Sequence, residues 1–270
     1  MPIKKDPSGR RYVQVEVEVP GTPEQVWDAV ATGPGVSSWF VPAEIDERVG
    51  GTAKLNFGPG MDSFATVTAW DPPHRFAADS RDDPNPASPT IATEWIVESR
   101  GGGTCTVRVI HSWFAETDDW DKQFEGHEQG WVVFFRILRA YLTHFPGQHA
   151  SVFQVMAMTP GDVPSAWQAL TEPLGLGAAA AGQTVTSTPD APRFTATVER
   201  IGTREHPELL LRLQHPVQGL AHLFAMPMGG TIVLPVRFFL FGANAAQAAA
   251  RMEPQWKAWM EQHFPAPVMP

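Results

Sequence analysis

The sequence predicts two tandem α+β domains, each a curved antiparallel sheet wrapped around a long C-terminal helix. Its 270 residues suffice for two domains of ordinary size, placed at residues 1–146 and 150–270. The first observation behind this prediction is an internal repeat. Residues 13–30 (VQVEVEVPGTPEQVWDAV) and 153–170 (FQVMAMTPGDVPSAWQAL) align without a gap. Matching positions are Gln14/Gln154, Val15/Val155, Pro20/Pro160, Gly21/Gly161, Trp27/Trp167 and Ala29/Ala169.

The second observation is that both copies end alike. Each runs through strand-like sequence to an amphipathic segment that stops at His-Phe-Pro, at residues 144–146 and 263–265. The repeat is far longer than a solenoid unit of roughly 20–50 residues, which indicates two complete domains. Any function therefore belongs to one copy, to the other, or to both.

The first copy opens with a strand and a short helix. Residues 11–19 alternate between valines and polar side chains, the period of a half-buried strand, and Pro20-Gly21 ends it. Thr22, a proline and Gln25 then form a capping box at the start of a helix. Gly33-Pro34-Gly35 breaks this helix, and a second helical turn is expected to run to Phe40.

Strands and turns continue to residue 114. Glycine pairs and triplets and an Asp-Pro-Pro turn separate short β-type segments, and such short connections favour antiparallel pairing. The expected strands are 44–49, 52–57, 63–70, 75–80, 91–99 and 104–114.

The segment 119–145 changes to a helical period. Apolar and aromatic residues recur every three or four positions and form one stripe on a helix that begins after Thr117 or Asp118. The stripe comprises Phe124, His127, Trp131, Phe134, Phe135, Leu138, Leu142 and Phe145.

The second copy repeats this order in a shorter form. Its closing helix is expected at 244–263, with Pro254 either kinking it or starting a new segment. Its expected strands are 152–158, 184–188, 193–200, 208–214, 217–224 and 231–241. Both copies thus follow a helix-grip fold, in which a curved sheet and a straight helix leave a space between them.

Composition narrows the classes of partner. The net charge of −9 and the lack of clustered basic residues argue against nucleic acid and anionic membranes. No apolar run approaches the ~20 residues that span a bilayer, so we expect a cytoplasmic protein without membrane insertion. The single cysteine, Cys105, excludes an intrachain disulfide and is expected to be a buried structural thiol.

Four motifs of the first copy form a familiar series: residues 39–42 (WFVP), 49–51 (VGG), 71–76 (DPPHRF) and 127–131 (HEQGW). Together they resemble the START/Bet v1-like superfamily, within it the group similar to the activator of Hsp90 ATPase. The resemblance covers roughly residues 11–145, whereas residues 150–264 match by fold pattern only. It implies a pocket for apolar molecules, a co-chaperone module or a cyclisation catalyst, because members of the superfamily do each of these.

The candidate ligand site lies in the space between sheet and helix of the first copy. Trp131 and Phe134, on the helix face opposite the sheet, are expected to line it with aromatic residues of the strands, although core packing explains many of these aromatics equally well. His111 and His127 could orient a ligand carbonyl or act as an acid or base, or could be hydrogen-bonded structural histidines. The candidate residues are Trp39, Phe57, Phe64, Trp95, His111, Trp113, His127, Trp131 and Phe134.

No cofactor or metal is expected. Residues 127–131 superficially resemble a zinc-binding helix, but Trp131 stands where a second histidine would be needed. The function predicted first is non-catalytic binding of a small hydrophobic molecule. The alternatives are a polyketide aromatase/cyclase-like enzyme, and a module that interacts with an Hsp90-like chaperone.

Overall fold

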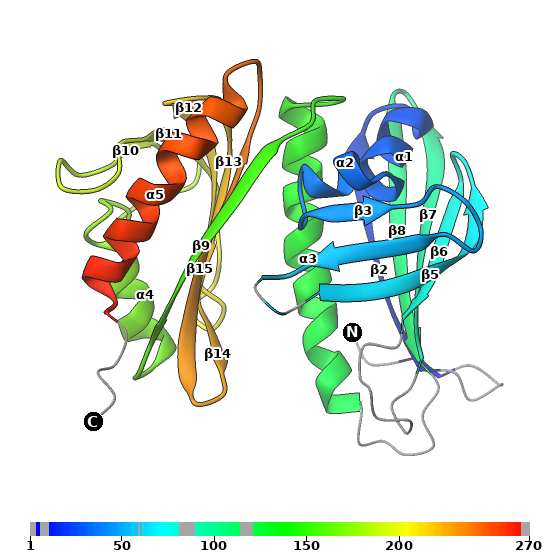
Figure 1. Cartoon of the computed structure of the whole chain (residues 1–270), viewed down its shortest axis with the longest axis horizontal. Helices are drawn as coiled ribbons and strands as arrows, with labels where there is room; N and C mark the ends of the chain where they lie inside the picture. The colour runs from blue at the N-terminus through cyan, green and yellow to red at the C-terminus, as the bar shows by residue number, and fades with distance from the viewer. Residues whose placement is uncertain are drawn as a thin grey trace. The chain divides into compact units, whose positions relative to one another are not determined.

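The computed structural model describes residues 4–5, 11–58, 60, 62–80, 90–113 and 121–265, except for the side chains of Lys5, Trp113 and 121–129. The chain divides into two compact units, residues 1–149 and 150–270, and each is described by itself (Figure 1).

The first unit is an antiparallel sheet that curls around one long helix (Figure 1). The strand order is β1-β2-β8-β7-β6-β5-β4-β3, so the first long strand pairs with the last, and Val13 lies opposite His111. The strands are β1 (Lys4–Lys5), β2 (Arg11–Pro20), β3 (Ala43–Ile45), β4 (Thr52–Asn56), β5 (Asp62–Asp71), β6 (Arg75–Ser80), β7 (Ile91–Gly101) and β8 (Thr104–Trp113). The helices are α1 (Pro23–Ala31), α2 (Gly33–Ser37) and α3 (Asp121–His144).

Residues close in sequence determine where α1 begins and how closely α2 packs against it. The capping box predicted for α1 is confirmed: Thr22 accepts from the backbone N–H of Gln25, and the Gln25 side chain accepts from that of Thr22. Gly35 lets α2 approach α1 closely, because a Cβ there would lie 1.8 Å from the carbonyl oxygen of Asp28.

The helical stripe predicted for α3 packs on the inner face of the sheet. Phe135, Leu138, Leu142 and Phe145 are all buried, and the helix lies against β2. Near its end, the Tyr141 hydroxyl donates to the carbonyl of Gln148, and burial raises the pKa of Tyr141 to about 12.

The second unit has a similar topology built on a seven-stranded sheet. β9, the repeat counterpart of β2, pairs with the last long strand, β15, and α5 lies against both. The strands are β9 (Ser151–Thr159), β10 (Thr184–Thr186), β11 (Thr195–Ile201), β12 (Glu208–His215), β13 (Gly219–Phe224), β14 (Met226–Met228) and β15 (Thr231–Leu240). The helices are α4 (Val163–Thr171) and α5 (Ala245–His263).

The core of the second unit lies between its sheet and α5. Trp256 of the helix packs against Phe194, Phe238 and Trp259, and all four are buried. Pro254 lies inside α5, which runs continuously past it. The predicted fold class, two tandem helix-grip domains, is confirmed by these two units. Among the helices described, none combines the length and apolar character needed to cross a membrane.

Candidate functional site

Seven aromatic residues of the first unit gather where α3 faces the sheet. We call them the aromatic cluster: Trp39, Phe40, Phe57, Trp95, Trp131, Phe134 and Phe135. Trp131 of α3 lies at its centre, with its ring centroid 5.1 Å from that of Trp95 in β7 and 5.5 Å from that of Phe40. Edge-to-face and offset arrangements of this kind stabilise aromatic packing beyond simple area burial. The cluster therefore joins the helix, the sheet and the segment after α2.

Trp39 anchors the inner side of the cluster. Its side chain is fully buried, its ring centroid lies 6.0 Å from that of Trp95, and its Nε1–H donates to the carbonyl of Ala29 at 2.7 Å. A buried indole with a satisfied N–H is a structural element of the core. Trp39 thus packs on the buried side of the aromatic cluster and belongs to the core.

Burial divides the cluster into two sides. Trp39, Phe40, Trp95 and Phe135 are buried. Phe57, Trp131 and Phe134 are only half-buried, so part of each ring is accessible. These three rings give the cluster a partly accessible apolar side.

A polar pair borders this apolar surface. His111 of β8 lies with its ring centroid 6.4 Å from that of Trp131, and its Nδ1 is 2.9 Å from the hydroxyl of Thr93 in β7. The two residues are direct cross-strand neighbours. Their hydrogen bond fixes the imidazole, so that the ring is held in a defined orientation beside Trp131.

Arg11 belongs to the same end of the sheet and was not singled out from the sequence. It is 4% exposed and stands in β2 two residues before Val13, which pairs with His111. The signal was present: Arg11 is in phase with the buried valines of its strand, where a charge is unusual. The inner face at this end therefore carries a cation as well as an imidazole.

The remaining predicted residues separate into two groups. Phe64 is 54% exposed, because it is in phase with Thr66 and Thr68 on the outer face of β5. The Lys54 ammonium lies over its ring, 5.8 Å from the ring centroid. Contrary to the prediction, Phe64 does not belong to the aromatic cluster. The side chains of Trp113 and His127 lie outside the described residues.

Cys105 stands apart from the aromatic cluster. Its side chain is fully buried, its Sγ–H donates to the carbonyl of Gly21, and burial raises the pKa of the thiol. This environment suits a structural thiol.

The helix-grip architecture and the motifs around the cluster can be compared with those of known protein families. Residues 20–143 match the family described as "Activator of Hsp90 ATPase homolog 1-like protein". This match confirms, for that portion of the chain, the predicted resemblance to the START/Bet v1-like superfamily. Within that superfamily, the portion is similar to the activator-of-Hsp90-ATPase-like group.

Solved structures of similar proteins have low sequence identity to this chain. The di-domain ARO/CYC BexL from the BE-7585A biosynthetic pathway is 14% identical over 96% of this chain and 100% of its own, with a TM-score of 0.45. DynU16, a putative protein of the dynemicin biosynthetic locus, is 18% identical over 92% and 95%, with a TM-score of 0.43. The Aha1 dimer from Colwellia psychrerythraea is 22% identical over 48% and 95%, with a TM-score of 0.42.

No curated protein matches the chain in sequence.

Proposed function

We propose that the first unit binds a small hydrophobic molecule between α3 and its sheet, without transforming it. The observation that supports this proposal is the half-buried side of the aromatic cluster, formed by Phe57, Trp131 and Phe134. Pockets for small molecules combine such apolar and aromatic walls with a few polar groups that set orientation.

The polar groups at this end of the sheet indicate which polar groups a ligand would have. His111, held by Thr93, and Arg11 place an imidazole and a guanidinium on the same inner face. A ligand with an apolar or aromatic body and one carbonyl, hydroxyl or carboxylate group fits this arrangement. Trp113 and His127 remain predicted members of the site.

A ligand screen with a thermal-shift readout tests the proposal. The full chain is melted with a panel of fatty acids, sterols and aromatic ketones, and native mass spectrometry detects any compound that copurifies. Saturating ligand at about 100 times its Kd should stabilise the first unit by roughly 2.7 kcal/mol.

Two variants localise the effect. Trp131→Ala removes the central ring of the cluster, and loss of an aromatic contact should weaken binding about tenfold. Phe64→Ala is the matched control, because this ring lies on the outer face of the same sheet. A ligand that binds both variants equally well, or a panel without any binder, would contradict the proposed site.

The family match supports a second candidate function, stimulation of an Hsp90-type chaperone. Titrating the full chain into such a chaperone should then raise its ATPase rate to a plateau, and a chaperone inhibitor should abolish the added activity. An ATPase rate that stays constant over the titration would exclude this role.

The position of His111 supports a third candidate, an aromatase/cyclase-like reaction. An imidazole beside an aromatic-lined surface can move a proton at a ketone of a folded polyketone. Turnover of a poly-β-ketone mimic that disappears in His111→Ala would establish catalysis and refute the non-catalytic proposal. A bound but unchanged mimic would favour simple binding.

A further inference from the structure

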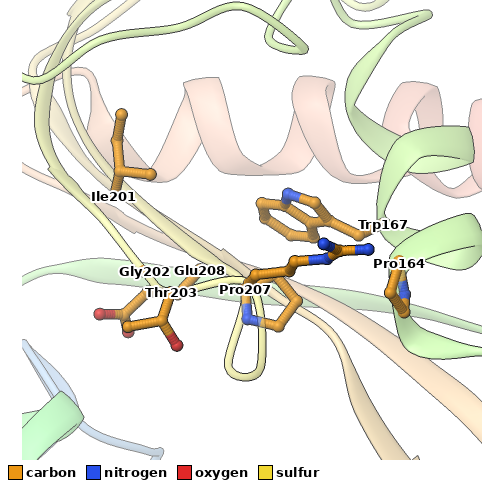
Figure 2. A pocket seen from close by; sticks show the side chains of 8 residues that line it. Pro164, Trp167, Ile201, Gly202, Thr203, Pro207 and Glu208 are labelled. Carbon is orange, nitrogen blue, oxygen red and sulfur yellow. The ribbon is translucent and has the colours of Figure 1, made fainter.

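The second unit contains a pocket that the sequence did not predict. It measures about 260 Å³ and lies between α4 and the hairpin that joins β11 to β12. Figure 2 shows Trp167 and Pro164 of the helix on one side, and Gly202 and Thr203 of the hairpin on the other, with Pro207 between them. All its lining residues belong to the second unit, so the pocket is independent of the aromatic cluster.

The internal repeat explains why a pocket exists here. Trp167 is the counterpart of Trp27, which is 8% exposed and packs edge-on against Trp70 of β5 at a centroid distance of 5.1 Å. In the second unit, the corresponding place near the end of β11 is taken by Ile201, which is 40% exposed. Where the first copy places a second indole beside the helix, the second copy has an open space.

The walls of this space are suited to a flat apolar group. Trp167 is half-buried, and its ring lines the pocket together with Pro164, Pro207 and Ile201. A planar aromatic ligand can stack on an indole and on proline rings at low conformational cost. It would restore the ring contact that Trp27 makes in the first copy.

Charge at the pocket favours an anion. Glu208 lines the pocket, but its carboxylate is paired with Arg200, at 3.3 Å from Nε, and with His222, at 3.4 Å from Nε2. Arg204 also lines the pocket, is exposed, and forms no ion pair with any residue in the part of the chain that the structure describes. Its guanidinium is therefore available for a carboxylate, which it can bind with two parallel hydrogen bonds.

We propose that this pocket binds a small planar aromatic carboxylate, with its ring on Trp167 and its carboxylate on Arg204. The second unit then has a binding site of its own, at a different place in the fold from the site proposed for the first unit.

Calorimetric titration of the full chain with 2-naphthoate tests this proposal. Arg204→Gln should weaken binding about tenfold or more, since it removes a charge-assisted hydrogen bond. Trp167→Leu should weaken it similarly, and its melting curve reports whether the unit stays folded. Arg251→Gln is the matched control, because this exposed arginine of α5 does not line the pocket.

Two comparisons separate this site from the one in the first unit. Both titrations are repeated in Trp131→Ala, which weakens any binding of the probe by the first unit but should leave the affinity of the Trp167 pocket unchanged. In that variant 2-naphthalenemethanol, which lacks the carboxylate, should bind about tenfold more weakly than 2-naphthoate. Affinity that is equal in Arg204→Gln and Arg251→Gln, an alcohol that binds as well as the acid, or no binding at millimolar 2-naphthoate would each overturn the proposal.

Discussion

Replacing Trp39 by phenylalanine should destabilise the first unit strongly while leaving the ligand-contacting side of the cluster in place. The fully buried indole N–H donates to the carbonyl of Ala29 at 2.7 Å. Leaving that buried acceptor without its donor costs about 1–3 kcal/mol. The smaller ring adds a cavity, which brings the expected loss to about 2–4 kcal/mol.

Hydrogen exchange of the full chain measures this loss of unfolding free energy separately for each unit. Peptides from β7 and β8 of the first unit should exchange roughly 30- to 1,000-fold faster in Trp39→Phe, the equivalent of the expected loss in free energy of unfolding. Peptides from the second unit serve as the internal control.

Trp131→Phe is the matched variant in α3. Since Trp131 is only half-buried, exchange should accelerate far less than in Trp39→Phe, while ligand affinity falls. Equal exchange rates in the wild type and Trp39→Phe would refute the assignment of Trp39 as the structural anchor. A loss of affinity in Trp39→Phe as large as in Trp131→Phe would refute the division of the cluster into two sides.

Three further predictions concern local structure. Thr22→Ala removes the capping box of α1 and should lower the stability of the first unit by about 1 kcal/mol, measured by the same exchange experiment. Asp162 caps α4, and hydrogen bonds from the backbone N–H and hydroxyl of Ser165 hold its pKa below the ordinary value of 3.8. Its contribution to stability is present above pH 3.8 and disappears as the pH falls through the lowered folded-state pKa, so the melting temperatures of wild type and Asp162→Ala should converge in acid. Cys105 should react slowly with a disulfide reagent in the folded chain and rapidly in urea, because it is buried and its pKa is raised; fast labelling of the folded chain would contradict this.

Patterns with a fixed period made much of the fold predictable. The alternating valines of β2, the capping box at Thr22 and the stripe of α3 each depend on neighbours close in sequence. The structure confirms the first two, and it confirms the stripe from Phe135 to Phe145, while the side chains of Phe124 and His127 lie outside the described residues. The order of these elements, repeated from residue 153, was enough to predict two tandem helix-grip domains.

The site residues were harder to predict than the fold. The prediction selected residues by their chemical type and gave too little weight to the face of the strand on which each residue lies. Phe64 looked like a pocket residue, yet its neighbours at alternate positions, Thr66 and Thr68, mark the outer face. Arg11 was not predicted as a site residue, yet it is in phase with the buried valines of its strand. The pocket beside Trp167 could not be predicted, because it depends on how a helix and a distant hairpin fit together in space.

The pairing of β2 with β8 has a consequence for how the first unit forms. Val13 finds its partner, His111, only after every other strand of the sheet has been synthesised. Contacts so distant in sequence carry a high loop-closure cost and slow the search for the native state. As the chain leaves the ribosome, β2 therefore stays without its main partner until β8 has been synthesised.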